Sequence, residues 1–479
     1  MKQTRRKLLK WSAMIGAGTA LAACAQPAPT AAPQPTKAAT QPTAAPQPTK
    51  AATQPPTATA QPTAAAKKKV NLVAWFADRR TINVMTEEVM KAEFQKANSH
   101  IEVEIVFVPE PQIPAKMATA FAGNQAPNIT ALDETQLSGF LKQGFIKPIP
   151  EGIINVAQEM GKRVADTYRV APGPAYHALP NGNMPCVLFY NNELLQKKGL
   201  KPEQIPTKWD EFIAWAKELT VWKGDEISQW GFTFVGAPWI WDSVAYQKGS
   251  WMFKDSKKCM LDDPANADAW RFVLDLLDKH KLDFRTAPLT PQDRVGQGLA
   301  YTCLQFGFGY GFFKTTYPNT SIGTLPLPTF AGKPPFGRST DDLGFCVTVQ
   351  SKDADIVAAT WTLYRYLVGP DYQRRYAVLR GVQPSLLKVS SEEMYTEKNP
   401  EWRGIALATK AGNFKSDGIW PAEATGLIHQ DLWERIVNKN EAPTTVLKDH
   451  TAKVDQILVG MDNVLLTGRD GWKAEWERG

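Results

Sequence analysis

Strand and helix patterns alternate where the chain becomes rich in apolar residues. Residues 70–76 form a short apolar run, and residues 101–108 begin with the strict alternation of a strand that buries one face. Residues 84–97 have helical spacing, a second helix is expected over 115–122, and a short strand follows at 128–132. This β-α-β-α-β order predicts a mostly parallel sheet with helices on both faces. In such sheets, ligands bind beyond the carboxyl ends of the strands.

The N-terminus has the pattern of an export signal. A basic block with Arg5 and Arg6 precedes an apolar stretch at 11–23, and Leu-Ala-Ala-Cys ends at Cys24. The stretch is shorter than the roughly 20 residues that cross a bilayer. These residues resemble a twin-arginine (Tat) lipoprotein signal, which implies cleavage after residue 23 and a lipid anchor on Cys24, on the outer face of a bacterial membrane (extracellular or periplasmic). An uncleaved N-terminal anchor with a chance cysteine is the alternative.

A tether follows the signal. Residues 25–66 are almost entirely Ala, Pro, Thr and Gln, and a 13-residue unit at 32–44 starts again at residue 45. A segment with no aromatic and no large aliphatic side chain cannot bury enough surface to offset its ordering entropy. We therefore expect residues 24–69 to be disordered and extended, at about 3.1 Å per residue, with a reach on the order of 100 Å from the membrane.

The charge of the chain is unevenly distributed. The formal net charge is +7, but residues 1–69 hold ten Lys and Arg and no acidic residue, which leaves −3 on residues 70–479. A weakly acidic body lacks the basic surface that binds phosphate backbones, so we expect no nucleic-acid partner.

Metal and cofactor motifs are absent from the sequence. Four cysteines follow Cys24, none of them in a Cys-x-x-Cys pair or near a histidine, so no metal site is expected. They are either buried as small hydrophobic side chains or paired in disulfides, and the sequence leaves both open. Phosphate loops, His-Glu-x-x-His and Gly-x-Ser-x-Gly motifs do not occur, and we expect neither a cofactor nor an enzyme. The cysteines are Cys186, Cys259, Cys303 and Cys346.

A series of short, distinct sequence blocks is distributed over about 400 residues of the chain. They are 72–76, 93–98, 101–103, 122–129, 144–149, 178–180, 188–195, 199–200, 206–212, 325–332, 366–368 and 381–385. Their order and spacing resemble the family 1 extracellular solute-binding proteins of ABC importers, the carbohydrate-binding type that is maltose-binding-protein-like. Asn128 departs from the family, which usually has Asp at that position.

The resemblance implies an α/β, two-lobed periplasmic-binding-protein fold of type II. Each lobe would be a mostly parallel sheet flanked by helices, with the ligand cleft between the lobes. Residues 70–179 and 343–384 would form the N-terminal lobe, and 180–342 and 385–479 the C-terminal lobe. The protein would be a monomer that captures a sugar and delivers it to a permease. An oligosaccharide is weakly favoured, and polyols, glycerol phosphates and polyamines remain open.

Tryptophan supplies the strongest chemical signal. The chain has 16 of them, and Trp239, Trp241 and Trp420 stand beside Gly or Pro, outside any regular pattern. Large flat rings with a few polar groups suit a sugar, which offers C–H faces and hydroxyl edges. Plain packing is the alternative for these three, and it is the expectation for Trp209, Trp270 and Trp361.

Polar ligand-binding candidates follow the predicted strands. Phe76, which ends the first strand, is a ligand-binding candidate, as are Asp78 and Arg79 after it, which match a family position where an acid and a base reach sugar hydroxyls. In the Gly-aromatic segment 307–311, Tyr310 matches the family's stacking aromatic best, since glycine lets the backbone approach a ligand. The remaining candidates are Asp133 and Glu134, after the strand at 128–132, and Arg338, Asp341 and Asp342, near the expected interlobe crossing. Each of these charges alone is equally compatible with a solvated loop.

Two other classes of function stay open. A glycoside hydrolase or lyase would use the same aromatic cleft with two carboxylates about 5 to 9.5 Å apart, for which Asp341 with Asp133 or Asp78 is the candidate pair. An exported adaptor that binds proteins would need a large exposed apolar patch instead.

Overall fold

The computed structural model describes most of the chain from Lys68 onward. The described residues are 68–161, 164–165, 169–170, 175–250, 252–255, 258–286, 288–332, 337–410, 415–416 and 422–459. The predicted signal, the lipid site at Cys24 and most of the tether lie outside this part, as does Trp420. Among the helices that the structure describes, none has the length and apolar character that a membrane crossing requires.

The first sheet has the strand order β14-β3-β1-β2. Strands β1 (Val70–Ala77) and β2 (Ile101–Val108) run parallel in register along their full length, and β3 (Ile129–Ala131) is also parallel to β1. Strand β14 (Phe345–Val347) joins antiparallel to β3, although more than 200 residues separate the two in the sequence. Alternate side chains of β1 are buried, so the apolar pattern of 70–76 marks a strand packed on a core.

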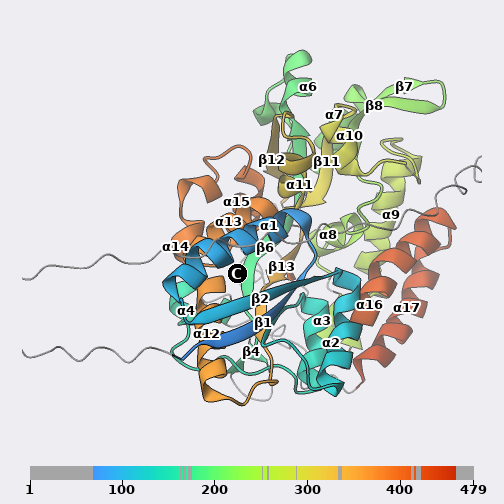
Figure 1. The fold of residues 1–479 in the computed structure, drawn as a ribbon. Helices are drawn as coiled ribbons and strands as arrows, with labels where there is room; N and C mark the ends of the chain where they lie inside the picture. Colours follow the sequence, from blue (N-terminus) through green and yellow to red (C-terminus); the bar gives the residue numbers. More distant parts are fainter. Residues whose placement is uncertain are drawn as a thin grey trace, which may run out of the picture. The chain divides into compact units, whose positions relative to one another are not determined.

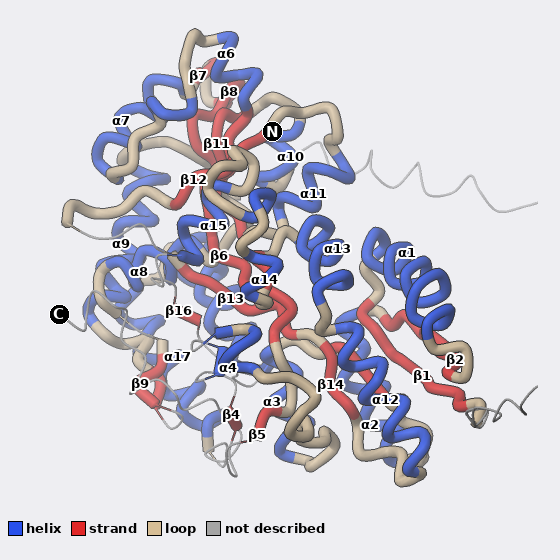
Figure 2. The backbone as a smooth tube through the Cα atoms, turned by 90° about the vertical axis from the view of Figure 1, so that its left-hand side faces the viewer, coloured by secondary structure: helices blue, strands red, loops and turns tan. Residues whose placement is uncertain are grey.

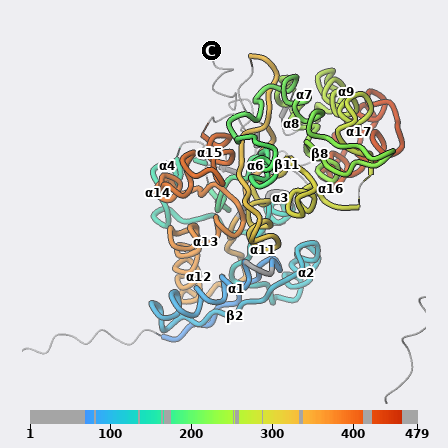
Figure 3. The backbone as a smooth tube through the Cα atoms, turned by 90° about the horizontal axis from the view of Figure 1, so that it is seen from above, coloured from blue at the N-terminus to red at the C-terminus, as the bar shows by residue number. Residues whose placement is uncertain are grey.

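The helices of the first sheet confirm the predicted order with shifted boundaries. Helix α1 (Arg80–Val89) begins four residues before the prediction and continues as a π-helical turn, Met90–Gln95. Ile82 in the first turn packs on the core three residues before the buried Met85, so the helical spacing begins before residue 84. Helix α2 (Ile113–Ala122) matches its prediction, and α3 (Glu134–Lys142) follows β3. Figure 3 shows α12 (Ala354–Leu367) and α13 (Pro370–Arg380) beside α1 and β2, from which they are far in sequence.

The second sheet is built around the long strand β6 (Pro180–Asn191). Its order is β16-β13-β6-β11-β8-β7, and β12 and β15 also pair with β6. The other strands are β7 (Val221–Lys223), β8 (Glu226–Thr233), β11 (Ala300–Phe306), β12 (Ile322–Pro326), β13 (Arg338–Leu343), β15 (Gln383–Pro384) and β16 (Lys415–Ser416).

This sheet differs from the mostly parallel arrangement that we expected. Strand β6 is antiparallel to β11, β12, β13 and β15. The reason lies in the chain path: β6 carries the chain into the second sheet, and β13 returns it to β14 of the first. Two passages in opposite directions pair antiparallel. Figures 1 and 2 show β6 and β13 side by side at this crossing. The lobe boundaries stay a prediction, and β15, placed in the N-terminal lobe, pairs with β6.

Helices cover the second sheet and enclose an aromatic core. Trp241 stacks on Trp270 with 5.3 Å between ring centroids, and Trp270 contacts Trp433 at 6.0 Å. The helices are α6 (Asn192–Lys197), α7 (Trp209–Leu219), α8 (Ile240–Gln247), α9 (Pro264–Asp278), α10 (Pro291–Gly296), α11 (Gly309–Thr316), α14 (Leu387–Ser390), α15 (Arg403–Lys410), α16 (Ala422–Gly426) and α17 (Pro443–Leu458). Smaller elements are α4 (Val156–Glu159), β4 (Arg169–Val170), β5 (Ala175–Tyr176), β9 (Phe253–Asp255) and β10 (Lys258–Cys259). Trp209, Trp270 and Trp361 are buried, as predicted.

The four cysteines of the body are buried as thiols. Burial raises the pKa of Cys259 to about 12, and burial likewise raises the pKa of Cys303 and Cys346. These thiols are therefore protonated near neutral pH and pack as small hydrophobic groups.

We predict that Gly231→Ala destabilises the protein. A Cβ at Gly231 on β8 would lie 2.0 Å from the backbone oxygen of Ala216 on α7, and neither backbone can move cheaply. We expect a loss of about 1 to 3 kcal/mol of unfolding free energy in urea titrations. The control is Gly139→Ala in α3, where a Cβ meets nothing within 4 Å and helix propensity favours alanine by up to about 1 kcal/mol. Equal effects of the two changes would contradict this packing.

Candidate functional site

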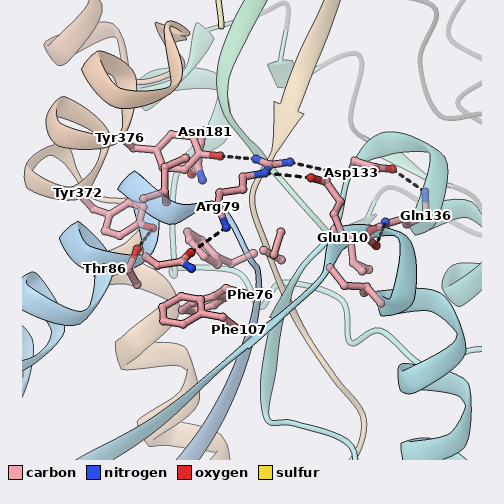
Figure 4. A pocket seen from close by; sticks show the side chains of 17 residues that line it. Phe76, Arg79, Thr86, Phe107, Glu110, Asp133, Gln136, Asn181, Tyr372 and Tyr376 are labelled. Atoms are coloured by element: carbon pink, nitrogen blue, oxygen red, sulfur yellow. Dashed lines mark hydrogen bonds and ion pairs between the residues drawn. The ribbon is translucent and has the colours of Figure 1, made fainter. Parts of the chain in front are cut away.

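A pocket lies at the carboxyl ends of β1, β2 and β3, where the parallel sheet predicts it (Figure 4). Its walls combine aromatic rings with charged and amide groups. The labelled lining residues are Phe76, Arg79, Thr86, Phe107, Glu110, Asp133, Gln136, Asn181, Tyr372 and Tyr376. We call it the Arg79 pocket.

Arg79 is the centre of the hydrogen bonds in this pocket. Its guanidinium binds Glu110 with two bonds, Nη2 to Oε1 at 2.7 Å and Nε to Oε2 at 3.2 Å. Nη1 donates to Tyr376 Oη at 3.3 Å and lies 3.5 Å from Asp342 Oδ1. This bidentate geometry fixes the plane of the guanidinium.

Asp342 joins the pocket to the strand crossing. The side chain lies on β13, is almost fully buried, and accepts from Arg380 Nε and Tyr376 Oη, both at 2.7 Å. Burial opposes its ionisation, but Arg380 and Arg79, through their charges, and hydrogen bonds from Arg380 and Tyr376 outweigh it and lower the pKa of Asp342. Asp342 is therefore a carboxylate near neutral pH. We call Asp342 with Arg79, Arg380 and Tyr376 the Asp342 bridge.

Three rings gather on the second sheet, close to this bridge. Trp239 lies 5.2 Å from Phe306 and 6.5 Å from Phe308, measured between centroids, and Phe306 lies 6.2 Å from Phe308. Trp239 and Phe308 are half-buried. Arg380, a member of the bridge, has its Cζ 5.7 Å from the Phe308 centroid. This aromatic cluster of Trp239, Phe306 and Phe308 therefore adjoins the Arg79 pocket through one arginine.

A buried polar group underlies the aromatic cluster. Arg338 has its Cζ 5.5 Å from the Phe306 centroid, and its Nη1 lies 3.2 Å from Asp242 Oδ2 and 2.6 Å from His429 Nε2. His429 Nε2 also lies 3.1 Å from Asp242 Oδ2, so its role as donor or acceptor depends on the tautomer, and in a neutral imidazole it can accept from Arg338, which only donates. Burial, and next the charge of Arg338, lower the pKa of His429 in agreement with this.

No group of three or more His, Cys, Asp or Glu side chains within the described ranges is arranged to hold a metal ion. The site's chemistry is that of stacking and hydrogen bonding.

Comparison with known proteins decides the family. The model for bacterial extracellular solute-binding proteins matches residues 90–402. The chain belongs to this family. It is 22% identical over 378 residues to the sn-glycerol-3-phosphate-binding periplasmic protein UgpB of Rhizobium meliloti (strain 1021), covering 74% of this chain and 85% of that protein.

Solved structures of the same fold include two sugar receptors. The GacH receptor of Streptomyces glaucescens GLA.O, solved unliganded and with acarbose, superposes with a TM-score of 0.67 at 18% identity, over 82% of this chain and 100% of that one. The maltose/maltodextrin-binding domain MalE of Bdellovibrio bacteriovorus, bound to maltotriose, gives 0.64 at 17%, over 81% and 99%. The predicted fold class is thereby confirmed.

The structure brings half of the predicted site residues of this solute-binding protein together. Phe76, Arg79 and Asp133 line the Arg79 pocket, and Asp133 also accepts from the backbone N–H of Gln136 at the start of α3. Asp342 contacts Arg79. Trp239 belongs to the aromatic cluster, and Arg338 lies against its member Phe306.

The remaining acidic candidates are Asp78, Asp341 and Glu134. Asp78 is exposed and accepts from Asn83 at 2.7 Å. Asp341 is buried on β13 and accepts from Asn183 at 2.9 Å. Glu134 is the first residue of α3.

Two predicted aromatic contacts are corrected by the structure. Trp241 is fully buried and stacks against Trp270. Tyr310 is 2% exposed, packs edge-on against Trp402 at 4.9 Å, and donates to Glu401 at 3.1 Å. Both rings stabilise the interior, because each lies inside a helix whose buried face it occupies.

Several site residues were missed by sequence reasoning. Phe308 stands in the same Gly-aromatic segment as Tyr310, two residues earlier, and is half-buried near Trp239. Glu110, Tyr376 and Arg380 carry no motif, and their partners are 31 to 297 residues away in sequence.

We predict that His429→Gln makes the free energy of unfolding depend less on pH on the acid side of neutrality. Since the pKa of His429 is lowered on folding, the unfolded chain takes up a proton below about pH 6.5 that the folded protein does not. The contribution of His429 to the free energy of unfolding is complete above about pH 6.5 and is lost as the pH falls, by up to about 1.4 kcal/mol per pH unit. Urea unfolding at pH 7.5 and 5.5 measures it.

The wild-type protein is the reference for this comparison. His177 and His280 also have lowered pKa values, and both remain in the variant, so only the difference between the two proteins reports on His429. Identical pH dependence in the two proteins would contradict the neutral, buried imidazole.

Proposed function

We propose that this extracellular solute-binding protein captures a neutral saccharide of oligosaccharide size and delivers it intact to the permease of an ABC importer. The observation that carries the proposal is the adjacency of the aromatic cluster to the Arg79 pocket. Rings of this kind stack on the C–H faces of a sugar, while guanidinium, carboxylate and amide groups bind its hydroxyls.

The charges of the site favour a neutral ligand over a phosphorylated one. Arg79 is paired with Glu110 and Asp342, Arg380 with Asp342, and Arg338 with Asp242. Each guanidinium is therefore already neutralised by a carboxylate, and a phosphate would have to displace one of them. The similarity to a glycerol-phosphate-binding relative makes this the second candidate ligand class.

A hydrolase with the same cleft is less well supported. Glycoside hydrolysis needs a carboxylic acid that holds its proton. The pKa of Asp342 is lowered, so this carboxyl group does not hold its proton near neutral pH.

The mode of action follows from the two halves of the site. A solute that touches both the Arg79 pocket and the aromatic cluster stabilises the conformation that brings them together, so binding favours a closed form. We propose that this form docks on the permease as a monomer, and that a lipid on Cys24 and the tether hold the protein near it, which raises the effective concentration.

We predict that Trp239→Ala weakens saccharide binding by about 1 to 3 kcal/mol, because it removes the largest ring of the cluster. Calorimetric titration with maltotriose, mannotriose, acarbose and sn-glycerol 3-phosphate measures this, with chromatography of the recovered solute. The control is Trp222→Ala on the edge strand β7, whose side chain is 39% exposed and lies outside the site. Only a saccharide is expected to bind the wild type, and to be recovered intact.

Two results would contradict the proposal. Selective binding of sn-glycerol 3-phosphate would move this protein to the second ligand class. Recovery of shortened saccharides would make it an enzyme.

A further inference from the structure

Arg380 is the residue that contacts both halves of the site. Its Nε donates to Asp342 Oδ2 at 2.7 Å, and its Cζ lies 5.7 Å from the centroid of Phe308. The side chain is largely buried, with 22% of its surface exposed. Through Asp342, which lies 3.5 Å from Arg79 Nη1, one continuous set of contacts runs from the Arg79 pocket to the aromatic cluster.

Glycine contacts in the backbone place Arg380 beside Phe308. Gly381 ends α13 in a left-handed conformation with φ of 67°, and a Cβ there would lie 1.9 Å from the backbone oxygen of Gly307. A Cβ on Gly307 would in turn lie 2.1 Å from the oxygen of Gly381. The two chain segments therefore touch through their backbones, and the residues next to the contact, Arg380 and Phe308, are brought together.

The geometry of Arg380 uses two properties of a guanidinium together. Its N–H edge binds the buried carboxylate, and its planar cation interacts with the π-system of the ring. A lysine supplies the charge but not the fixed plane, and a methionine supplies only the length.

We propose that Arg380 is a positioning residue for solute binding, which holds the Phe308 ring at a fixed orientation relative to the Arg79 pocket. The inference rests on the proposed function, since the ring is positioned for a solute that spans both halves. Without the guanidinium, the Phe308 ring is free to change its χ angles and the stacking surface is no longer preorganised. Affinity then falls because the solute must order the ring on binding.

The test uses a 19F label that needs no solute. 4-Fluorophenylalanine is incorporated at position 308 of the full chain, and the 19F chemical shift is compared in the wild type and in Arg380→Met, Arg380→Lys and Arg374→Met. Arg374 is the matched control. It lies on the same helix and binds Glu392 and Asp371, each at 2.7 Å, without an aromatic contact to the site. Maltotriose, mannotriose and acarbose are then titrated into the unlabelled proteins.

The expected result separates Arg380 from a merely structural residue. Arg380→Met shifts and broadens the 19F signal and weakens binding of the saccharide that the wild type takes by on the order of tenfold. Arg380→Lys keeps a positive charge beside Asp342. It is expected to fold like the wild type and to restore part of the 19F signal and part of the saccharide affinity. Arg374→Met leaves both readouts unchanged.

Two results would overturn the inference. One is a 19F signal in Arg380→Met and Arg380→Lys that matches that of the wild type. The other is an altered signal with unchanged saccharide affinity. A wild type that binds none of the three saccharides contradicts the proposed function, and the 19F signal then decides the placement of the ring by itself.

Discussion

The carboxylate of Asp342 has almost no access to water, and its need for partners organises the site. A buried charge is tolerated only when it is paired and hydrogen-bonded. Asp342 meets this requirement with Arg79, Arg380 and Tyr376. One of these partners follows the first strand of the chain and two lie on α13, so the pairing gathers groups that the sequence keeps far apart. Both halves of the site depend on where this carboxylate lies.

The position of Asp342 is itself a consequence of the chain path. Strand β6 enters the second sheet and β13 returns from it, and the two pair antiparallel with Asp342 opposite Gly182. Groups on the returning strand are therefore within reach of both sheets. The Arg79 pocket uses the carboxyl ends of the parallel strands, and the aromatic cluster uses the segment after β11.

The sequence predicted those features that local patterns encode. A short apolar run predicted β1 and alternation predicted β2, both nearly to the residue, and position after a strand pointed to Arg79 and Asp133. The antiparallel direction of the strands that pair with β6 was not predictable from a local pattern, because it depends on where distant strands pair. The burial of Tyr310 was not predictable for a similar reason. Helix α11 starts at Gly309 and turns Tyr310 toward Trp402, which no spacing rule reveals.

The role of Asp342 in organising the site is tested most directly by the substitution Asp342→Asn. The comparison is Asp371→Asn, in which an exposed carboxylate of α13 loses its pairing with Arg374. Urea unfolding and saccharide titration are measured for both variants. We predict that Asp342→Asn lowers the free energy of unfolding by about 3 to 5 kcal/mol and abolishes saccharide binding. We expect Asp371→Asn to lower the free energy of unfolding by less than about 1 kcal/mol and to leave binding unchanged. Wild-type stability and affinity in Asp342→Asn would contradict this role.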